Sequence, residues 1–445
     1  MAGARQDAGC GADDSESKIS SVSTMKNLRS NFVHRVKIIG KFVSIQIVVQ
    51  ALSLVSGLLL VRTLDQQQYA YFTIANTMQS TMNLLADTGI SMSLSAIGGK
   101  VWQDRYRFGQ LINTAMELRY YLAVTSISIV TPILMWMLIR NGASLTYAVL
   151  ITFVVLLGLS FQLTTDVLLV VLRLHSKINN IQKSDLFSSV TRLTLLGIFY
   201  IIYLNSVVAI GISSIIIMMQ RIMLARWASE KIDSKASINE EYKKNILFII
   251  KHQAPNAIYY CLQGQLMLYL ITLFGNTNNI AEIGALGRLG IIFSLITAVM
   301  SNIVLPSISR CQSASILRKR YLELLSILFM IAGLMISCTL LFSEQILWIL
   351  GSKYIYLHKE LVLIVINSWF SSIVGIMWSI NASKAWINYS WINIPFTLSV
   401  QIVLLLLLDL SSVLNVIIFS LISQFPAFIV NVYLTNRGIA EYESA

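Results

Sequence analysis

The stretch 146–172, TYAVLITFVVLLGLSFQLTTDVLLVVL, contains one charged residue, Asp166. A helix of about 20 such residues crosses about 30 Å of hydrocarbon. Similar apolar segments, joined by short polar links, lie at 38–61, 70–97, 120–139, 186–204, 207–225, 246–274, 282–305, 322–343, 361–382, 390–409 and 413–434. The sequence therefore predicts an all-α polytopic membrane protein with about 12 transmembrane helices.

The composition agrees with this prediction. Hydrophobic residues make up 56% of the 445 positions, charged residues make up 12%, and the mean hydropathy is +0.70. A soluble domain is rarely so apolar. The net charge of +12 is typical of basic cytoplasmic loops, so we expect no nucleic-acid partner. If the amino terminus is cytoplasmic, most Lys and Arg residues lie in cytoplasmic links, and the reverse orientation would place them outside. Because cytoplasmic loops of membrane proteins are enriched in Lys and Arg, we predict that both termini are cytoplasmic.

The segments divide into two halves of nearly equal length. An even number of helices in each half makes the halves parallel repeats, related by a pseudo-two-fold axis along the membrane normal. We expect two six-helix bundles and a cavity between them, as in many transporters. The predicted organisation is a disordered cytoplasmic tail at 1–37, a first bundle at 38–226, a cytoplasmic linker at 227–245, a second bundle at 246–434 and a cytoplasmic tail at 435–445.

Polar side chains recur at helical spacing within corresponding helices of the two halves. Asn76 and Asn83 lie on one face of the second segment, and Asn256 and Gln263 lie on one face of the seventh. Such faces are unfavourable against lipid. They either form hydrogen bonds with neighbouring helices or line a shared hydrated cavity that binds sugar or pyrophosphate.

Three arginines lie within or beside apolar segments: Arg288, Arg192 and Arg62. A charge at the bilayer centre costs about 2.5–3.5 kcal/mol on the insertion scale, so such residues need a reason to be there. A cationic cavity would suit a phosphate or pyrophosphate group, which arginine binds through paired hydrogen bonds. Alternatively, Arg62 and Arg192 extend to the membrane surface.

Two acidic residues lie inside apolar segments. Asp87 and Asp166 either pair with an arginine or take up the proton or sodium ion that couples transport. By contrast, Glu282 and Glu344 lie at expected outer helix ends, where we expect them to be solvated.

Motifs of soluble enzymes are absent from the sequence. The four cysteines and four histidines are scattered without metal-ligand spacing, so we expect no metal site and no disulfide. Gly284, Gly287 and Gly290 are spaced three apart in an apolar segment, which favours close helix packing over a nucleotide loop. We therefore expect no cofactor and no enzymatic activity.

Several motifs, in order along the chain, resemble those of one family. The motifs are RTLDQQQYAYF at 62–72, ADTGI at 86–90, EIGALGRL at 282–289, PSIS at 306–309 and LGSKY at 350–354. Together they are similar to the polysaccharide flippases, the Wzx-type branch of the multidrug/oligosaccharidyl-lipid/polysaccharide (MOP) exporter superfamily. Ala70 departs from the glycine that is usual in the first motif.

The resemblance implies a bacterial inner-membrane flippase without a cofactor. Such proteins move undecaprenyl-pyrophosphate-linked oligosaccharide from the cytoplasmic to the periplasmic leaflet, for O-antigen or capsule synthesis. The polysaccharide polymerase and the chain-length regulator are possible partners. Under this reading Arg288, Arg62 and Arg192 attract the pyrophosphate, and the polar faces contact sugar.

Other readings remain, among them a peptidoglycan-precursor flippase of the same superfamily. A multidrug/cation antiporter of the same superfamily has the same helix arrangement, although a cavity with more arginine than acid suits cations poorly. A membrane glycan polymerase would carry a large periplasmic loop, whereas the longest link here, 227–245, is expected to be cytoplasmic. A major-facilitator carrier also has 12 helices, but the spacing from Gly99 to Asp104 is one residue too long for its loop motif.

Overall fold

The computed structural model describes Gly40 and residues 44–233, 235–290, 293, 296–297, 300, 305, 308, 314–384, 386 and 389–444. The expected tail at 1–37 lies outside these residues, as does part of the predicted segment 282–305. Contacts divide the chain into two compact units, Met1–Val48 and Val49–Ala445. All of the packing reported below lies within the second unit.

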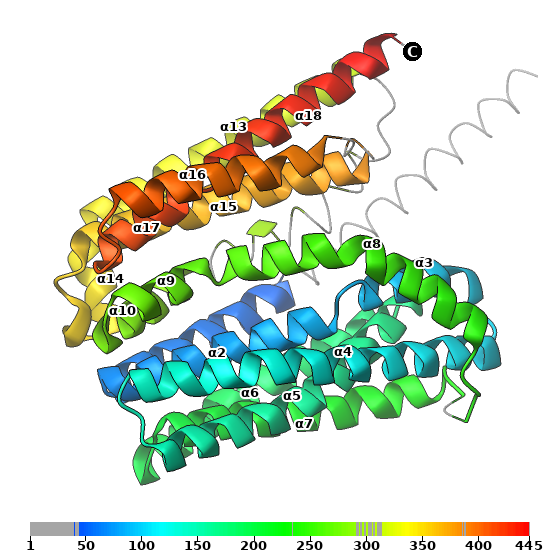
Figure 1. Cartoon of the computed structure of the whole chain (residues 1–445), viewed down its shortest axis with the longest axis horizontal. Helices are drawn as coiled ribbons and strands as arrows, with labels where there is room; N and C mark the ends of the chain where they lie inside the picture. Colours follow the sequence, from blue (N-terminus) through cyan, green and yellow to red (C-terminus); the bar gives the residue numbers. More distant parts are fainter. Residues whose placement is uncertain are drawn as a thin grey trace, which may run out of the picture. The chain divides into compact units, whose positions relative to one another are not determined.

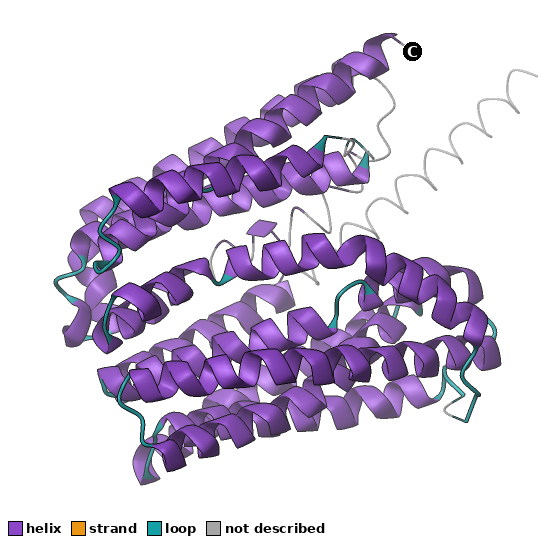
Figure 2. Ribbon diagram, in the orientation of Figure 1, coloured by secondary structure: helices purple, strands orange, loops and turns teal. Residues whose placement is uncertain are grey.

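Every regular element in the described residues is helical (Figure 2). The first half begins with the helix Ser44–Thr63. It continues with α2 (Gln66–Ala86), α3 (Ile90–Val101), α4 (Arg105–Arg140), α5 (Leu145–Leu174), α6 (Ile178–Ile202) and α7 (Ser206–Ser229).

The second half begins after the link that follows α7. Its helices are α8 (Glu240–Gly264), α9 (Leu266–Phe274), α10 (Thr277–Gly287), α13 (Ala314–Leu341), α14 (Ser343–Leu350), α15 (His358–Ser383), α16 (Asn393–Leu407), α17 (Val413–Ile422) and α18 (Phe425–Ser444). Short 3₁₀ turns at Arg288–Gly290, Ser352–Tyr354 and Ser390–Ile392 adjoin α10, α14 and α16.

Polar residues in the links determine where several helices begin. Asp65 accepts a hydrogen bond from the amide of Gln68 at the start of α2, and Asp104 accepts bonds from two amides at the start of α4. Ser144 and Asn239 cap α5 and α8 in the same way. These side chains satisfy amides that have no partner within the helix.

The predicted segment 70–97 is two helices. Asp87 ends α2, and Gly89 adopts a φ of 75° before α3 begins. A left-handed backbone of this kind favours glycine and interrupts a continuous helix. The segment is also more polar than the other predicted spans because it carries Asn76, Asn83 and Asp87.

The predicted segment 246–274 is interrupted as well. Helices α8 and α9 meet at Gln265 with a bend of 54°. Nine helices in the described residues are long and apolar enough to cross a membrane, and the bent pair brings the number to ten. The two other predicted spans are the polar 70–97 and the partly described 282–305.

Two groups of helices pack together (Figure 1). In the first, α2, α4, α5, α6 and α7 contact one another, with α5 along α7 and α2 along α4. In the second, α15 contacts α13, α17 and α18, and α16 contacts α18. Helix α10 lies against α2 and thereby joins the groups. A methyl group at Gly284 of α10 would overlap Thr73 of α2, so this approach requires glycine.

Helices α9 and α8, which begin the second half with α10, contact α4 near its two ends. At the end where α4 finishes, which we call the Tyr69 end, Arg140 Nη2 donates to the Leu273 carbonyl at 2.7 Å. At the opposite end, which we call the Lys243 end, Lys243 Nζ of α8 lies 3.3 Å from Glu117 Oε1 of α4. The link after α7 follows α4 there, since Asn113 Nδ2 donates to the Ala236 carbonyl at 2.8 Å.

Candidate functional site

Two of the predicted arginines lie in one polar cavity of about 270 Å³, which we call the arginine cavity. Arg192 comes from α6, and Arg288 follows α10. Ser53, Asn76 and Gln162 are among the polar residues that line it. Within the described part of the chain, no Asp or Glu lines the cavity. The cavity is therefore cationic and has no acidic counterion in its wall.

Neighbouring groups orient the Arg288 side chain. Its Nε donates to the Tyr69 hydroxyl at 3.2 Å, and that hydroxyl donates to the Gly284 carbonyl at 3.1 Å. The guanidinium carbon lies 5.5 Å from the centre of the Phe72 ring, within cation–π range. The side chain also lies close to the backbone of Gly57. Arg288 is thus positioned by elements from both halves of the chain.

Arg192 has an unsatisfied donor. Its Nε is buried, and it has no hydrogen-bond partner among the described residues. A buried donor without a partner is unfavourable by about 1–3 kcal/mol, and by more when the group is charged. An anion in the arginine cavity would provide the missing acceptor.

The two predicted acidic residues meet around a third arginine, Arg119 of α4. Arg119 Nη2 lies 2.9 Å from Asp166 Oδ2, and Arg119 Nη1 lies 3.3 Å from Asp87 Oδ1. Asn83 joins them, because its Nδ2 donates to Asp166 Oδ2 at 2.9 Å and its Oδ1 accepts from Arg119 Nη2 at 3.1 Å. We call Asn83, Asp87, Arg119 and Asp166 the carboxylate cluster.

With both carboxyls ionised, this cluster has a formal charge of −1. The Arg119 side chain is 0% exposed, whereas the side chains of Asp87 and Asp166 are 30% and 28% exposed. The geometry provides the arginine pairing that the sequence left open. It also leaves one negative charge that a proton or a sodium ion could neutralise.

Sequence reasoning missed Arg119 because the predicted third segment began at residue 120. The spacing of the residues that α4 buries would have pointed to Arg119. Arg119 lies at the four-residue spacing that leads to Ala123, and the same buried face continues through Ser126 and Val130. An arginine on that face requires a buried anionic partner.

The other predicted site residues are separated from these groups. Arg62 is exposed at the Tyr69 end, where its Nη2 donates to the Trp348 carbonyl at 2.7 Å. Asn83 belongs to the carboxylate cluster and not to the arginine cavity. The Asn256 side chain lies outside the described part of the structure. Gln263 lies near the end of α8, where its Nε2 donates to Gln401 Oε1 at 3.1 Å.

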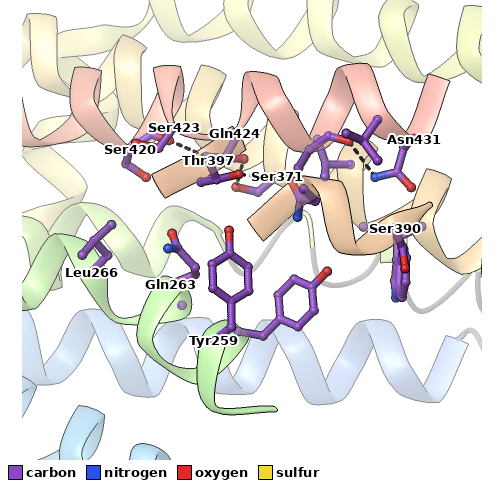
Figure 3. Close-up of a pocket in the computed structure, with 18 of the residues that line it drawn as sticks. Tyr259, Gln263, Leu266, Ser371, Ser390, Thr397, Ser420, Ser423, Gln424 and Asn431 are labelled. Carbon is purple, nitrogen blue, oxygen red and sulfur yellow. Dashed lines mark hydrogen bonds between the residues drawn. The ribbon is translucent and has the colours of Figure 1, made fainter. Parts of the chain in front are cut away.

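Gln263 lines a larger cavity of about 490 Å³, which we call the aromatic cavity (Figure 3). Its wall comes from α8, α9, α15, α16, α17 and α18. Figure 3 shows Tyr259 and Gln263 extending from α8 toward Thr397 and Ser371. No acidic or basic side chain lines it among the described residues. Trp378, on this wall, was not predicted as a site residue because it comes from a helix far along the chain.

The sequence expectation for Glu282 was wrong. This residue of α10 is only 6% exposed, and its carboxylate accepts a hydrogen bond from the Tyr356 hydroxyl. Glu344 is exposed, as expected. Glu282 is buried because the 3₁₀ turn Ser352–Tyr354 and the residues after it fold over α10.

Solved structures of transporters share this fold. An inward-facing multidrug resistance MATE family transporter of the MOP superfamily matches with a TM-score of 0.66 and 16% identity, over 89% of this chain and 96% of that one. An outward-facing conformation of a multidrug resistance MATE family transporter of the MOP superfamily matches with a TM-score of 0.55 and 16% identity, over 91% of this chain and 94% of that one. The eukaryotic MATE transporter AtDTX14 has a TM-score of 0.58 and 12% identity, over 88% and 98%.

No protein-family model matches the sequence, and no curated protein matches it at a significant level. The structural matches cover most of both chains, but their identities are low, so they establish the fold. The helices also identify a multi-pass membrane protein. The chain therefore has the fold of the MATE transporters of the MOP superfamily, which have 12 helices in two bundles.

Proposed function

We propose that this chain is a flippase that moves undecaprenyl-pyrophosphate-linked oligosaccharide from the cytoplasmic to the periplasmic leaflet for surface polysaccharide synthesis. The arginine cavity is the observation that carries the proposal. Arg192 and Arg288 line one polar space, and no acidic residue stands in its wall among the residues that the structure describes. A pyrophosphate group would supply the negative charge that this wall lacks.

Such a substrate is both charged and hydrated, and the arginine cavity is both cationic and polar. A pyrophosphate and a hydrated glycan cannot enter hydrocarbon without losing their water, which is very unfavourable. Arginine side chains replace part of that hydration because the planar guanidinium forms paired hydrogen bonds with phosphate oxygens. The lipid chain would stay in the bilayer while the polar part passes between the two groups of helices.

We place the protein, as part of this proposal, in the bacterial inner membrane with both termini in the cytoplasm. Arg105, Arg107 and Lys243 lie at the Lys243 end, which places basic residues on the proposed cytoplasmic side. The Tyr69 end would then face the periplasm. There, the bonds from Arg62 to the Trp348 carbonyl and from Tyr69 to the Gly284 carbonyl support a state closed on that side.

The carboxylate cluster is proposed to couple transport to an ion gradient. Asp87 and Asp166 share one arginine, so taking up a proton or sodium ion would neutralise the remaining charge. If flipping is unaffected when both gradients are collapsed, the cluster has only a structural role.

A multidrug/cation antiporter is the second candidate function. It is favoured by the fold shared with multidrug transporters and by the negative charge of the carboxylate cluster. The arginine cavity argues against it, because two guanidinium groups repel a cationic substrate.

The first experiment measures the leaflet distribution of lipid-linked oligosaccharide in cells that lack this protein, with and without a plasmid copy. We expect accumulation in the cytoplasmic leaflet that the plasmid relieves. The Arg288→Ala variant should fail to relieve it at an equal protein level. Arg107→Ala is the matched control, since that side chain is 68% exposed. An unchanged distribution in cells without a redundant flippase would contradict the proposal.

A further inference from the structure

The aromatic cavity has a wall of three rings. Tyr259 and Tyr260 of α8 have ring centres 5.2 Å apart in an edge-to-face arrangement. The ring centre of Trp378, on α15, lies 6.4 Å from that of Tyr260. Such rings present flat apolar faces and also carry hydroxyl or indole groups that form hydrogen bonds.

The remaining wall combines apolar residues such as Leu266 and Val374 with neutral polar side chains, namely five amides and five aliphatic hydroxyls among the described residues. Several are held in place by one another. Gln424 Nε2 donates to Asn367 Oδ1 at 2.8 Å, and Ser371 Oγ donates to Gln424 Oε1 at 2.6 Å. The amides are therefore oriented before any ligand binds.

Ser423 provides a further indication of a ligand. The residue is 5% exposed and lines the cavity, and its hydroxyl oxygen is buried without a hydrogen-bond partner among the described residues. Buried hydroxyls are normally satisfied, so this one has capacity for a partner inside the cavity.

A third cavity lies between the aromatic cavity and the arginine cavity and shares lining residues with both. This bridging cavity, of about 280 Å³, shares Phe72, Asn76 and Arg288 with the arginine cavity. It shares Gly264 and Met267 with the aromatic cavity. The bend between α8 and α9 lies beside Gly264, at the point where the two spaces adjoin. One extended ligand could therefore contact Arg288 and the aromatic wall at the same time.

We propose that the aromatic cavity is a subsite for the neutral oligosaccharide part of the substrate, separate from the cationic subsite for the pyrophosphate. Sugar rings have hydroxyls that match amides and hydroxyls, and their C–H faces pack on aromatic rings. Its volume of about 490 Å³ lies in the usual range for ligand sites.

Two other ligand classes fit this wall less well. A lipid chain could not bond the unpartnered Ser423 hydroxyl or use the remaining hydrogen-bonding capacity of the amides, which is unfavourable. A cationic drug could lie over the rings, but the wall has no carboxylate among the described residues, and Arg288 lies next along the path. The neutral polar character thus favours a polyhydroxyl ligand.

This inference rests on the proposed function and adds a requirement to it. If the subsite exists, the protein distinguishes a lipid that carries the glycan from the same lipid without it. The two probes are radiolabelled undecaprenyl pyrophosphate and the lipid-linked oligosaccharide fraction of the organism that makes this protein. Binding is measured on the full chain in nanodiscs, with empty nanodiscs subtracted.

We expect the lipid-linked oligosaccharide to bind the wild-type protein roughly tenfold more tightly than undecaprenyl pyrophosphate does, from aromatic and hydrogen-bond contacts. Trp378→Ala should remove most of that difference and leave the affinity for undecaprenyl pyrophosphate unchanged. Trp378→Phe should retain part of it. Ser423→Ala, which removes an unpaired hydroxyl and should fold normally, should weaken only the oligosaccharide probe. Trp391→Ala, at a tryptophan 64% exposed, is the matched control.

Equal binding of the two probes to the wild-type protein would overturn the glycan subsite. The proposed function would still stand if Arg288→Ala weakened both probes. If neither lipid bound, but tetraphenylphosphonium bound in a manner sensitive to Trp378→Ala, both the subsite and the flippase proposal would be wrong and the cation antiporter would be favoured.

Discussion

Arg119 and Asp166 form a close ion pair in the first group of helices, with Arg119 Nη2 at 2.9 Å from Asp166 Oδ2. The guanidinium is fully buried, so its charge is compensated by groups on α2 and α5 and not by water. Asn83 bonds both partners. The pair therefore links three helices that the chain brings together only on folding.

We predict that Arg119→Ala destabilises the folded protein by about 3 kcal/mol, because it leaves two carboxylates without their cation. The partial exposure of Asp87 and Asp166, 30% and 28%, keeps the effect at the lower end of the range for buried pairs. Thermal unfolding in detergent tests this prediction, with Arg107→Ala as the control. Equal melting temperatures for the two variants would contradict it.

The two aspartates should respond differently to substitution. Asp166 Oδ2 accepts hydrogen bonds from both Arg119 and Asn83, whereas Asp87 accepts one from Ser91 besides its contact with Arg119. Asp166→Asn should therefore lower the melting temperature more than Asp87→Asn does. Asp87→Asn should fold but lose the dependence of flipping on the ion gradient. Gradient-driven flipping by this variant at the wild-type level would exclude Asp87 from coupling.

The sequence predicted the fold because membrane helices require long apolar segments, which are visible in stretches such as 146–172. It did not predict the breaks at Gly89 and Gln265, because backbone conformation at a single residue depends on packing. Glycine alone does not reveal a break, since Gly211 and Gly333 lie within helices.

The candidate site was predictable only in part. Arg192 and Arg288 stood out as charges in apolar segments, and the structure brings them into one cavity. Arg62 has the same signal, but it lies at the Tyr69 end because its helix ends there. Trp378 gave no signal, since a tryptophan in a membrane helix usually faces lipid or packs in the core. Which side chains share a cavity depends on contacts between distant helices.

Tyr69→Phe tests how Arg288 is oriented. The substitution removes the hydroxyl that accepts from Arg288 Nε and donates to the Gly284 carbonyl. We expect a loss of about 1.5–3 kcal/mol in stability, the range for a hydrogen bond to a charged group, together with a strong loss of flipping. Arg288→Lys should fold normally and also lose flipping, because lysine lacks the planar fork. Wild-type flipping by both variants would show that orientation of Arg288 is unimportant.

The ion pair at the Lys243 end predicts a pH effect. A hydrogen bond to Glu117, reinforced by its charge, raises the pKa of Lys243 above the ordinary lysine value. A raised folded-state pKa means that the pair stabilises the protein below the ordinary pKa of about 10.4, and that this contribution disappears as the pH rises through the folded-state pKa. The melting-temperature difference between wild type and Lys243→Met should therefore shrink at alkaline pH. In a Glu117→Gln background, Lys243→Met should show no such trend with pH. If the melting-temperature difference between wild type and Lys243→Met stayed constant as the pH rose, the pairing would be contradicted.

Gly284 and Gly287 of α10 provide a matched test of the contact between the two groups of helices. A methyl group at Gly284 would overlap the side chain of Thr73 on α2, whereas one at Gly287 would meet no described residue within 4 Å. Gly284→Ala should therefore destabilise the protein by about 1–3 kcal/mol through overpacking. Gly287→Ala should be neutral or stabilising by up to about 1 kcal/mol, because alanine favours the helix. The overlap lies mainly with Thr73 Oγ1 and Cγ2, so Thr73→Ala should reduce the cost of Gly284→Ala. If the two glycine variants melted at the same temperature, α10 would not pack against α2 through Gly284, and the joint between the helix groups would have to lie elsewhere.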